Sequence, residues 1–251
     1  MTTSSAATRE DVEAFLEETS FTGYQSVPLP HGLQVPGVDR RERADQVFSM
    51  PLEGRSVLDV GTSYGRYVYE AISRGASRAV GLEQNPDHSA VAMRIAELHG
   101  NRWEIRQGRV EELGDDETFD VVLFLNVLHH VADPVEAVRR LLAVCRQIMV
   151  IEFCLPDDPE LLMYLLGKPG AEPTKLTRAR ARIRSRVMRA ALGRMPAMAV
   201  GNWEYHRTFY FTPEAFDNLF RLHLGFFDEI AFAPSASGKR RVVAHCRVAG
   251  R

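Results

Sequence analysis

The sequence predicts an α/β fold built on a doubly wound, mostly parallel sheet. Between Ser56 and about residue 153, short apolar runs alternate with segments of helix length. This alternation, with short connections, is typical of parallel strands joined by helices. The runs "DVVLFL" and "IMVIEF" are apolar apart from one acid each, as expected for strands that are buried on both faces. Two strand-like runs near the end of the chain predict seven strands in all.

The alternating region predicts five strands and three helices. The strands are expected at 56–61, 78–83, 103–107, 119–125 and 147–153, and the helices at 64–74, 87–99 and 134–145. Upstream, "TREDVEAFLEE" predicts a helix that is capped by Thr8. "RRERADQVFSM" predicts a second helix, and the loop between them is rich in Pro and Gly.

The end of the chain predicts an insert, a helix and a hairpin. After Pro156 the alternation stops for about 50 residues. Thr212 and Pro213 then suit the cap and the first position of a helix, and "FFDEIAFA" and "RRVVAHCRV" predict two antiparallel strands. We therefore expect an N-terminal helix and lid segment at 1–50. A main domain is expected at 51–251, with a helical insert on its substrate side at about 156–208.

The composition is that of an ordinary globular chain, with 45% apolar and 25% charged residues among 251. No apolar run approaches the roughly 20 residues that a membrane-spanning helix needs. The N-terminus lacks the basic start and apolar core of a secretory signal, so we expect none. The three cysteines are scattered and form no Cys-x-x-Cys pair, which argues against a disulfide framework or a zinc site and predicts a reducing, cytoplasmic setting.

A glycine turn and an acid point to a nucleoside-containing ligand. Gly61 and Gly65 follow the first predicted strand, and Glu83 ends the second. In a doubly wound sheet, ligands bind at the carboxyl ends of the strands. Glycine lets the backbone approach such a ligand, and a carboxylate at Glu83 suits ribose hydroxyls. The spacing is Gly-x-x-x-Gly, which differs from the dinucleotide pattern Gly-x-Gly-x-x-Gly.

The motifs "LDVGTSYG", "GLEQN" and "FDVVLFLNVLHHVADP", in this order, resemble those of class I S-adenosylmethionine-dependent methyltransferases. The resemblance implies a Rossmann-like fold and S-adenosylmethionine as the cofactor. It also implies roles for nine residues. The methionine end is lined by Gly61, Thr62, Ser63 and Gly65, with Asp59 and the carbonyl of Asn126 at its ammonium; Glu83 takes the ribose, and Gln84 and the backbone of Val110 meet the adenine.

A narrower resemblance joins "LPHGLQVPGVD" to these motifs. The combination is similar to a branch that includes tRNA wobble-uridine carboxymethyltransferases and relatives that act on small molecules. Two positions depart from these patterns. His129 stands where the tRNA enzymes are expected to carry Tyr, and Arg109 stands where many methyltransferases carry an Asp that meets the adenine amino group.

The acceptor chemistry predicts a base near the cofactor. Methyl transfer from a sulfonium needs alignment, and a hydroxyl acceptor also benefits from a general base. His130, as the first candidate, and His129 follow the fourth predicted strand, and Glu152 ends the fifth. The alternatives are that one histidine caps a helix while the other packs, and that Glu152 pairs with an arginine.

Two further segments predict contacts with the substrate. Tyr24, Gln25 and His31 lie in the candidate lid of the N-terminal segment, whose alternative role is to cover an edge of the sheet. "NWEYHRTFYF" brings Tyr205, His206 and Arg207 together before the closing helix, as a pocket wall or as a packed joint.

The insert carries a local excess of positive charge. From Lys168 to Arg194 there are nine basic residues and one acid, so this stretch carries +8 within a chain of net charge −2. "TKLTRARARIRSRVMRAALGRM" predicts an amphipathic helix with an apolar stripe at Ala179, Ile183, Val187 and Ala191. Its arginines, Arg182 among them, leave four interpretations: nucleic acid, a membrane surface, an anionic small substrate, or a solvated lid.

Together these observations predict methyl transfer from S-adenosylmethionine to an oxygen or nitrogen of a small-molecule acceptor, such as a natural-product or sugar intermediate. The acceptor is expected near the insert and can be anionic. Two other functions remain as alternatives. One is modification of a tRNA wobble uridine, which the overall negative charge disfavours. The other is a non-catalytic cofactor-binding subunit.

Overall fold

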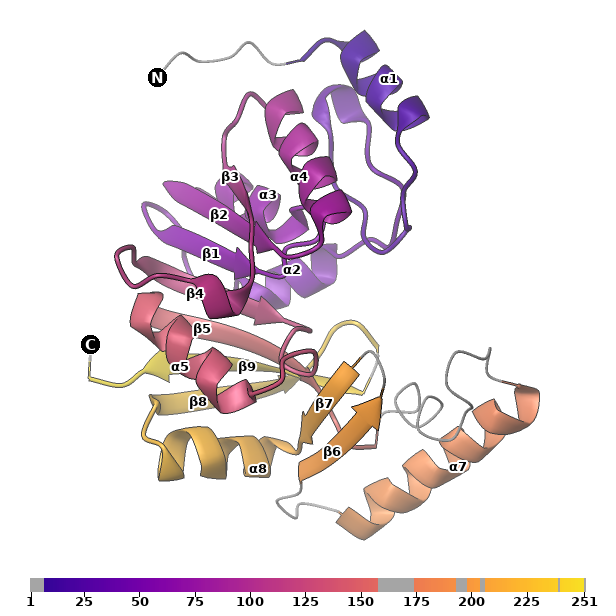
Figure 1. The fold of residues 1–251 in the computed structure, drawn as a ribbon, viewed down its shortest axis with the longest axis vertical. Helices are drawn as coiled ribbons and strands as arrows, with labels where there is room; N and C mark the ends of the chain where they lie inside the picture. Colours follow the sequence, from indigo (N-terminus) through magenta and orange to yellow (C-terminus); the bar gives the residue numbers. More distant parts are fainter. Residues whose placement is uncertain (1–6, 158–173, 193–197, 204–205, 239, 251) are drawn as a thin grey trace. The chain divides into compact units, whose positions relative to one another are not determined.

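The computed structural model describes residues 7–157, 174–192, 198–203, 206–238 and 240–250 (Figure 1). The chain divides into two compact units. Unit 1 comprises Met1–Leu123 with Val144–Arg146, and unit 2 comprises Phe124–Ala143 with Gln147–Arg251. The predicted division at residues 50 and 51 stays a prediction.

Seven strands form one sheet in the order β3-β2-β1-β4-β5-β9-β8. β1 pairs in parallel with β2 and with β4, and β2 pairs in parallel with β3. β9 runs antiparallel to both β5 and β8, so the predicted mostly parallel sheet and its closing hairpin are confirmed. The strands are β1 Ser56–Val60, β2 Arg78–Glu83, β3 Glu104–Gln107, β4 Phe119–Leu125, β5 Cys145–Cys154, β8 Phe227–Pro234 and β9 Arg241–Val248.

The four α-helices before β4 begin within two residues of their predicted starts, whereas the short helices η1 and η2 were not predicted. Thr8 and Asp11 form a reciprocal capping box at the start of α1. Asn85 caps α4, and its side chain accepts from the N–H groups of Asp87 and His88. The helices are α1 Arg9–Glu18, η1 Pro30–Gly32, α2 Arg41–Val47, α3 Arg66–Ser73, α4 Pro86–Leu98 and η2 Val110–Glu112.

The later helices are α5 Pro134–Val144, α7 Lys175–Leu192, α8 Pro213–Phe216 and η3 Asp217–His223. The side chain of Thr212 accepts from the N–H of Ala215, so the predicted cap of α8 is confirmed. The helix then continues as the π-helix η3, which the sequence does not predict. The ring of Phe153 in β5 stacks on Phe216 with 4.8 Å between centroids, and Phe216 lies 4.5 Å from Phe220. These rings fix the helix on the core of unit 2.

A separate two-stranded sheet was not predicted. β6 Met198–Trp203 pairs antiparallel with β7 His206–Phe211. The sequence of β6, "MAVGNW", contains Gly and Asn, which are depleted in strands. The strand therefore depends on pairing with its neighbour in sequence rather than on a strong local propensity.

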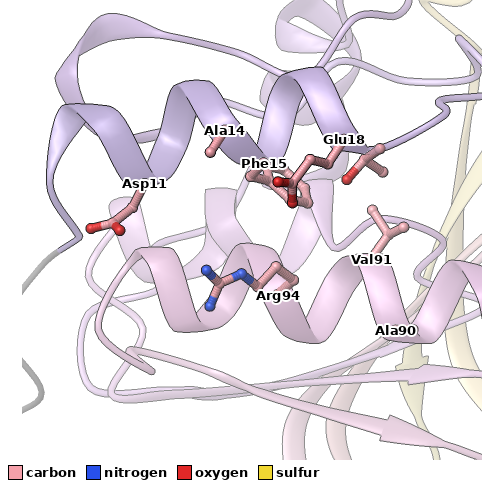
Figure 2. Close-up of a pocket in the computed structure, with 8 residues that line it drawn as sticks. Asp11, Ala14, Phe15, Glu18, Ala90, Val91 and Arg94 are labelled. Carbon is pink, nitrogen blue, oxygen red and sulfur yellow. The ribbon is translucent and has the colours of Figure 1, made fainter.

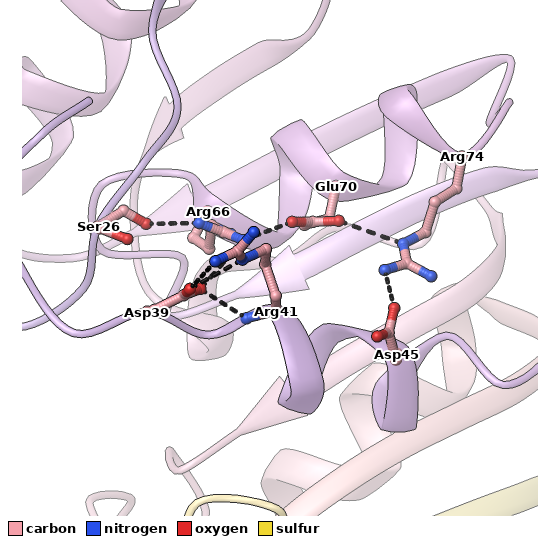
Figure 3. A network of polar contacts seen from close by, with 7 residues as sticks. All are labelled: Ser26, Asp39, Arg41, Asp45, Arg66, Glu70 and Arg74. Atoms are coloured by element: carbon pink, nitrogen blue, oxygen red, sulfur yellow. Dashed lines mark hydrogen bonds and ion pairs between the residues drawn. The ribbon is translucent and has the colours of Figure 1, made fainter. Parts of the chain in front are cut away.

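The N-terminal segment is fastened to α3 by a charged network (Figure 3). Arg66 is 2% exposed, donates to the carbonyl of Ser26 at 3.0 Å, and pairs with Glu70 at 2.6 Å. Arg74 bonds the other oxygen of Glu70 at 3.2 Å and reaches Asp45 of α2. Because these contacts join residues on three segments, the stretch before β1 packs as part of unit 1.

Candidate active site

The glycine turn between β1 and α3 has a strained backbone. Gly61, Ser63 and Gly65 all have positive φ, at 77°, 53° and 82°. Glycine adopts this region freely, whereas Ser63 does so at a cost that such sites tolerate when the surroundings fix them. The N–H groups of Gly61 and Thr62 both donate to the carbonyl of Leu82, at 2.8 and 3.1 Å. The turn is therefore held against the end of β2.

Glu83 connects the turn to the start of α4. Its side chain is 7% exposed, and its Oε2 accepts from the N–H of Ser63 at 2.7 Å while its Oε1 accepts from the N–H of Asn85 at 2.9 Å. A carboxylate oxygen can accept two hydrogen bonds. Each oxygen of Glu83 is thus oriented by the backbone and retains one acceptor position.

Asp59 at the end of β1 is buried, with 2% of its surface exposed. Burial raises its pKa from an ordinary 3.8 to about 7; the charge of Glu83 adds to this, while Thr62 and Arg43 favour the ionised form. Within the described part of the chain, Asp59 Oδ2 and Ser63 Oγ make no hydrogen bond. A polar, cationic ligand group at this position would satisfy the carboxylate and lower its pKa.

Arg43 was not predicted as a site residue. It lies in α2 with 4% of its surface exposed, and its guanidinium lies 5.8 Å from the centre of the Tyr67 ring. Its charge lowers the pKa of Asp59. In the sequence it belongs to the run "RRER", which looks like an exposed helix start. No local sequence pattern marks this residue, because its burial depends on the docking of α2 on α3, which is a long-range contact.

The predicted lid segment reaches the glycine turn through Gln25. This side chain is 3% exposed, and its Nε2 donates to the carbonyl of Thr62 at 3.1 Å. The N–H of Thr22 also donates to the Tyr64 hydroxyl at 3.2 Å. These contacts place the segment directly on the turn.

The two predicted substrate residues of that segment lie elsewhere on it. Tyr24 is 45% exposed, and Arg40 lies over its ring at 5.3 Å and donates to its carbonyl. His31 is exposed, has a φ of 61°, and contacts the carbonyl of Ala7 at 2.8 Å through Nε2. The roles of Tyr24 and His31 in binding substrate therefore stay predictions.

The two residues predicted to meet the adenine differ in exposure. Gln84 is exposed, while Val110 is 6% exposed at the start of η2. The side chain of Arg109 pairs with Glu111 at 3.4 Å. The N–H of Gly108 donates to the carbonyl of Glu83 at 3.0 Å, which joins the ends of β3 and β2.

In unit 2, Asn126 follows β4 with a φ of 60°. Its N–H donates to the carbonyl of Glu152 at 3.0 Å. The side chain is 7% exposed, and neither its oxygen nor its nitrogen bonds to any described residue. Left-handed backbone and buried, unsatisfied polar atoms are typical of a functional position.

The two predicted histidines lie side by side, with ring centroids 4.1 Å apart. His129 is half-buried, its Nδ1 lies 4.0 Å from Cys154 Sγ, and its ring stacks on Tyr210 at 6.5 Å. His130 is exposed. Cys154 and Tyr210 therefore orient the ring of His129. We call these three residues the His129 cluster.

Glu152 is fully buried in β5. Its Oε1 accepts a short hydrogen bond of 2.5 Å from the Ser235 hydroxyl, which in turn contacts Ser237 at 2.9 Å. The carbonyl of the same residue holds Asn126. A structural role in unit 2 is thus visible, and a catalytic role stays a prediction.

Other predicted residues are only partly covered. Tyr205 lies outside the described residues, and for His206 and Arg207 the structure describes the backbone alone. Arg182 is exposed on α7. Among the described residues, no group of three His, Cys, Asp or Glu side chains could hold a metal ion. None of the described helices has the length and apolar character needed to cross a membrane.

A pocket of about 360 Å³ lies between α1 and α4 (Figure 2). Phe15 and Val91 form part of its apolar lining, and Asp11, Glu18 and Arg94 bring charge to it. None of the predicted site residues lines this pocket. It is therefore distinct from the glycine turn.

Residues 57–147 match the model of the methyltransferase domain family. The chain is 43% identical over 84 residues to a ubiquinone biosynthesis O-methyltransferase of Azorhizobium caulinodans, which is 33% of each chain. It is 30% identical over 168 residues to a tRNA U34 carboxymethyltransferase of Aeromonas salmonicida, covering 64% of this chain and 48% of that one. The chain thus spans about half or less of the length of these relatives.

Solved structures share the fold at low identity. The N-terminal domain of EvdMO1, determined in the presence of SAH and D-fucose, has a TM-score of 0.63 and 16% identity, with 97% of this chain and 98% of that chain covered. The 1,6-didemethyltoxoflavin-N1-methyltransferase of Burkholderia thailandensis has a TM-score of 0.54 and 17% identity, covering 83% and 77%. Together with the sheet order and the glycine turn described above, these matches confirm the resemblance expected from the sequence: residues 57–147 match a methyltransferase domain, and the fold is that of class I S-adenosylmethionine-dependent methyltransferases.

Proposed function

We propose that the chain transfers a methyl group from S-adenosylmethionine to an oxygen or nitrogen atom of a small-molecule acceptor. The observation that carries the proposal is the geometry of Glu83. Both of its carboxylate oxygens are oriented by backbone N–H groups, of Ser63 and Asn85. Each retains an acceptor position, so the carboxylate can accept hydrogen bonds from the two hydroxyls of a ribose while it keeps its bonds to the backbone.

The other polar groups of the turn fit the amino-acid end of the donor. Asp59 offers a buried carboxylate oxygen to an ammonium, and the buried guanidinium of Arg43 in α2 suits a carboxylate. The backbone of Gly61 leaves room for close approach. When bound, S-adenosylmethionine supplies a methyl group on a positively charged sulfur, so the protein mainly has to align the acceptor atom.

For an oxygen acceptor, His129 is the base that the contacts favour. Its ring is oriented by Tyr210 and Cys154, whereas His130 is exposed. A base must be held within hydrogen-bond reach of the proton that it removes, and the half-buried ring of His129 meets this need better than the exposed ring of His130. The relative named as an O-methyltransferase supports an oxygen acceptor.

The second candidate is modification of a tRNA wobble uridine. The 168-residue match to a tRNA U34 carboxymethyltransferase supports it, as do the clustered arginines of the insert. His129, in the place of an expected Tyr, disfavours it. A non-catalytic cofactor-binding subunit is the third candidate.

One experiment separates the three functions. The protein is incubated with S-adenosylmethionine that carries a labelled methyl group, and separately with carboxy-S-adenosylmethionine that carries a labelled carboxymethyl group, together with either a pool of small metabolites or total tRNA. We expect label in a small molecule and none in tRNA. Label in tRNA alone would establish the second candidate, and calorimetric binding of the donor without transfer to either pool would establish the third.

A further inference from the structure

We propose that the exposed face of helix α7 binds the surface of an anionic lipid bilayer. The face carries a large apolar surface. Leu176, Ile183 and Val187 are 61%, 63% and 60% exposed. At 3.6 residues per turn they fall within an arc of about 40° on the helix, so they form one stripe. Among the positions of α7 whose burial is described, Ala181 and Ser185 are the buried ones, at 0% and 2% exposed.

Ser185 fixes this orientation of the helix. Its hydroxyl donates to the carbonyl of Asp157 at 2.6 Å. Ser185 lies about 180° around the helix from the centre of the stripe. The small side chains therefore face the protein, and the larger aliphatic ones face away from it.

Four arginines border the stripe. By the same helical geometry, Arg180 and Arg184 lie along one side of it and Arg182 and Arg186 along the other. All four are exposed. Across the described residues none of the four makes an ion pair, although Arg66, Arg74, Arg106 and Arg240 elsewhere all do. The sequence of α7 contains no acid.

The combination selects one kind of partner. An anionic bilayer takes both features, because aliphatic side chains enter the boundary of the acyl chains while the arginines meet lipid phosphates. A nucleic acid would use the arginines but would leave the apolar stripe in water. A second copy of α7 would bury the stripe but would bring arginines of the same sign together.

The test uses the whole chain and sedimentation with vesicles of phosphatidylcholine, either alone or with about 30% phosphatidylglycerol. We expect binding to the mixed vesicles, weak binding to the neutral ones, and loss of binding at high salt. R182Q/R186Q should weaken binding about 30-fold, since each basic residue near such a surface contributes about a factor of five. I183S/V187S should weaken it by about tenfold or more.

Matched control variants lie outside α7. Leu222 is 63% exposed in η3, as much as Ile183, and Arg247 is exposed in β9. L222S and R247Q should bind vesicles as the unchanged chain does. Because every substituted side chain is exposed, circular dichroism should show an unchanged fold.

Three results would overturn the proposal. The first is no binding to the mixed vesicles. The second is equal binding by I183S/V187S and the unchanged chain, which would leave the stripe without a role. The third is binding of single-stranded RNA, or formation of a dimer, that the α7 variants abolish while vesicle binding is absent.

Discussion

The glycine turn and the His129 cluster hold their polar groups in different ways. In the turn, backbone N–H groups orient the carboxylate of Glu83, and the turn itself bonds to β2. In the cluster, rings and a sulfur orient His129, and its neighbour His130 is exposed. Backbone contacts follow from the fold, whereas ring contacts depend on which side chains each chain carries. The comparison teaches that the proposed donor side can recur in related chains while the proposed acceptor side changes.

The largest expected effect tests the acceptor side. If an oxygen is methylated, His129→Ala should lower turnover by roughly 10²–10⁴-fold, the usual range for loss of a general base. Donor affinity should remain nearly unchanged. His223→Ala, at an exposed histidine of η3, is the control. A larger loss in His130→Ala than in His129→Ala, measured under single-turnover conditions, would show that burial of the ring does not identify the base.

The next effect tests the donor side. Glu83→Ala removes a charged acceptor of hydrogen bonds and should weaken binding of S-adenosylmethionine by about 1–3 kcal/mol, or roughly 10–100-fold. Calorimetry measures this affinity directly. Glu104→Gln, at an exposed glutamate of β3 that pairs with Arg106, should leave the affinity unchanged. Unchanged affinity in Glu83→Ala would instead remove the ribose assignment.

A pH dependence sharpens the role of Asp59. Its pKa in the folded chain is raised from 3.8 to about 7 by burial, so the folded chain holds a proton there that the unfolded chain has lost. The proton on Asp59 therefore contributes to the stability of the folded chain. This contribution is fully present below about pH 4 and is lost as the pH rises through 7.

The same shift affects donor binding. An ammonium favours the ionised carboxylate, so donor affinity should rise by up to about tenfold per pH unit below 7 and then level off. Binding at pH 6 should release a proton, which calorimetry in buffers of different ionisation enthalpy detects. Asp59→Asn should abolish both the pH slope and the proton release. A slope that persists in this variant would place the titrating group elsewhere.

The smallest expected effect concerns the lid segment. Gln25→Ala removes the hydrogen bond to the carbonyl of Thr62 and should weaken donor binding by a few-fold, in line with about 0.5–1.5 kcal/mol for a neutral hydrogen bond. Gln34→Ala, at an exposed glutamine of the same segment, serves as the matched control. Equal donor affinity in the two variants would mean that the segment covers the turn without positioning it.

Much of the fold could be predicted because strand burial and helix caps are local signals. Apolar runs predicted the buried strands β4 and β5, and Thr8, Asn85 and Thr212 cap helices as such residues usually do. β6 was not predicted because Gly201 and Asn202 lower the strand propensity of its sequence. The strand is stabilised by its pairing with β7.

The candidate site was predictable only where a motif describes it. Glu83 and the glycine turn follow from spacing, but the burial of Arg43 depends on how α2 packs against Tyr67. The exposure of Ile183 and Val187 depends on Ala181 and Ser185 facing inward, which is the reverse of what hydrophobicity alone favours. Long-range packing decides these cases, and a single sequence carries little information about it.

The contact of Arg66 with Ser26 also determines where the chain can be cut. Arg66 is almost fully buried, and one of its donors is satisfied by that carbonyl. Gly37 in the same segment leaves no space for a Cβ, because the backbone of Gln25 crosses directly above it. A truncated chain that starts at β1 would keep the three class I motifs and yet expose a guanidinium that the intact chain buries. Fragments for expression should therefore begin before residue 20, although the recognised methyltransferase domain begins at residue 57.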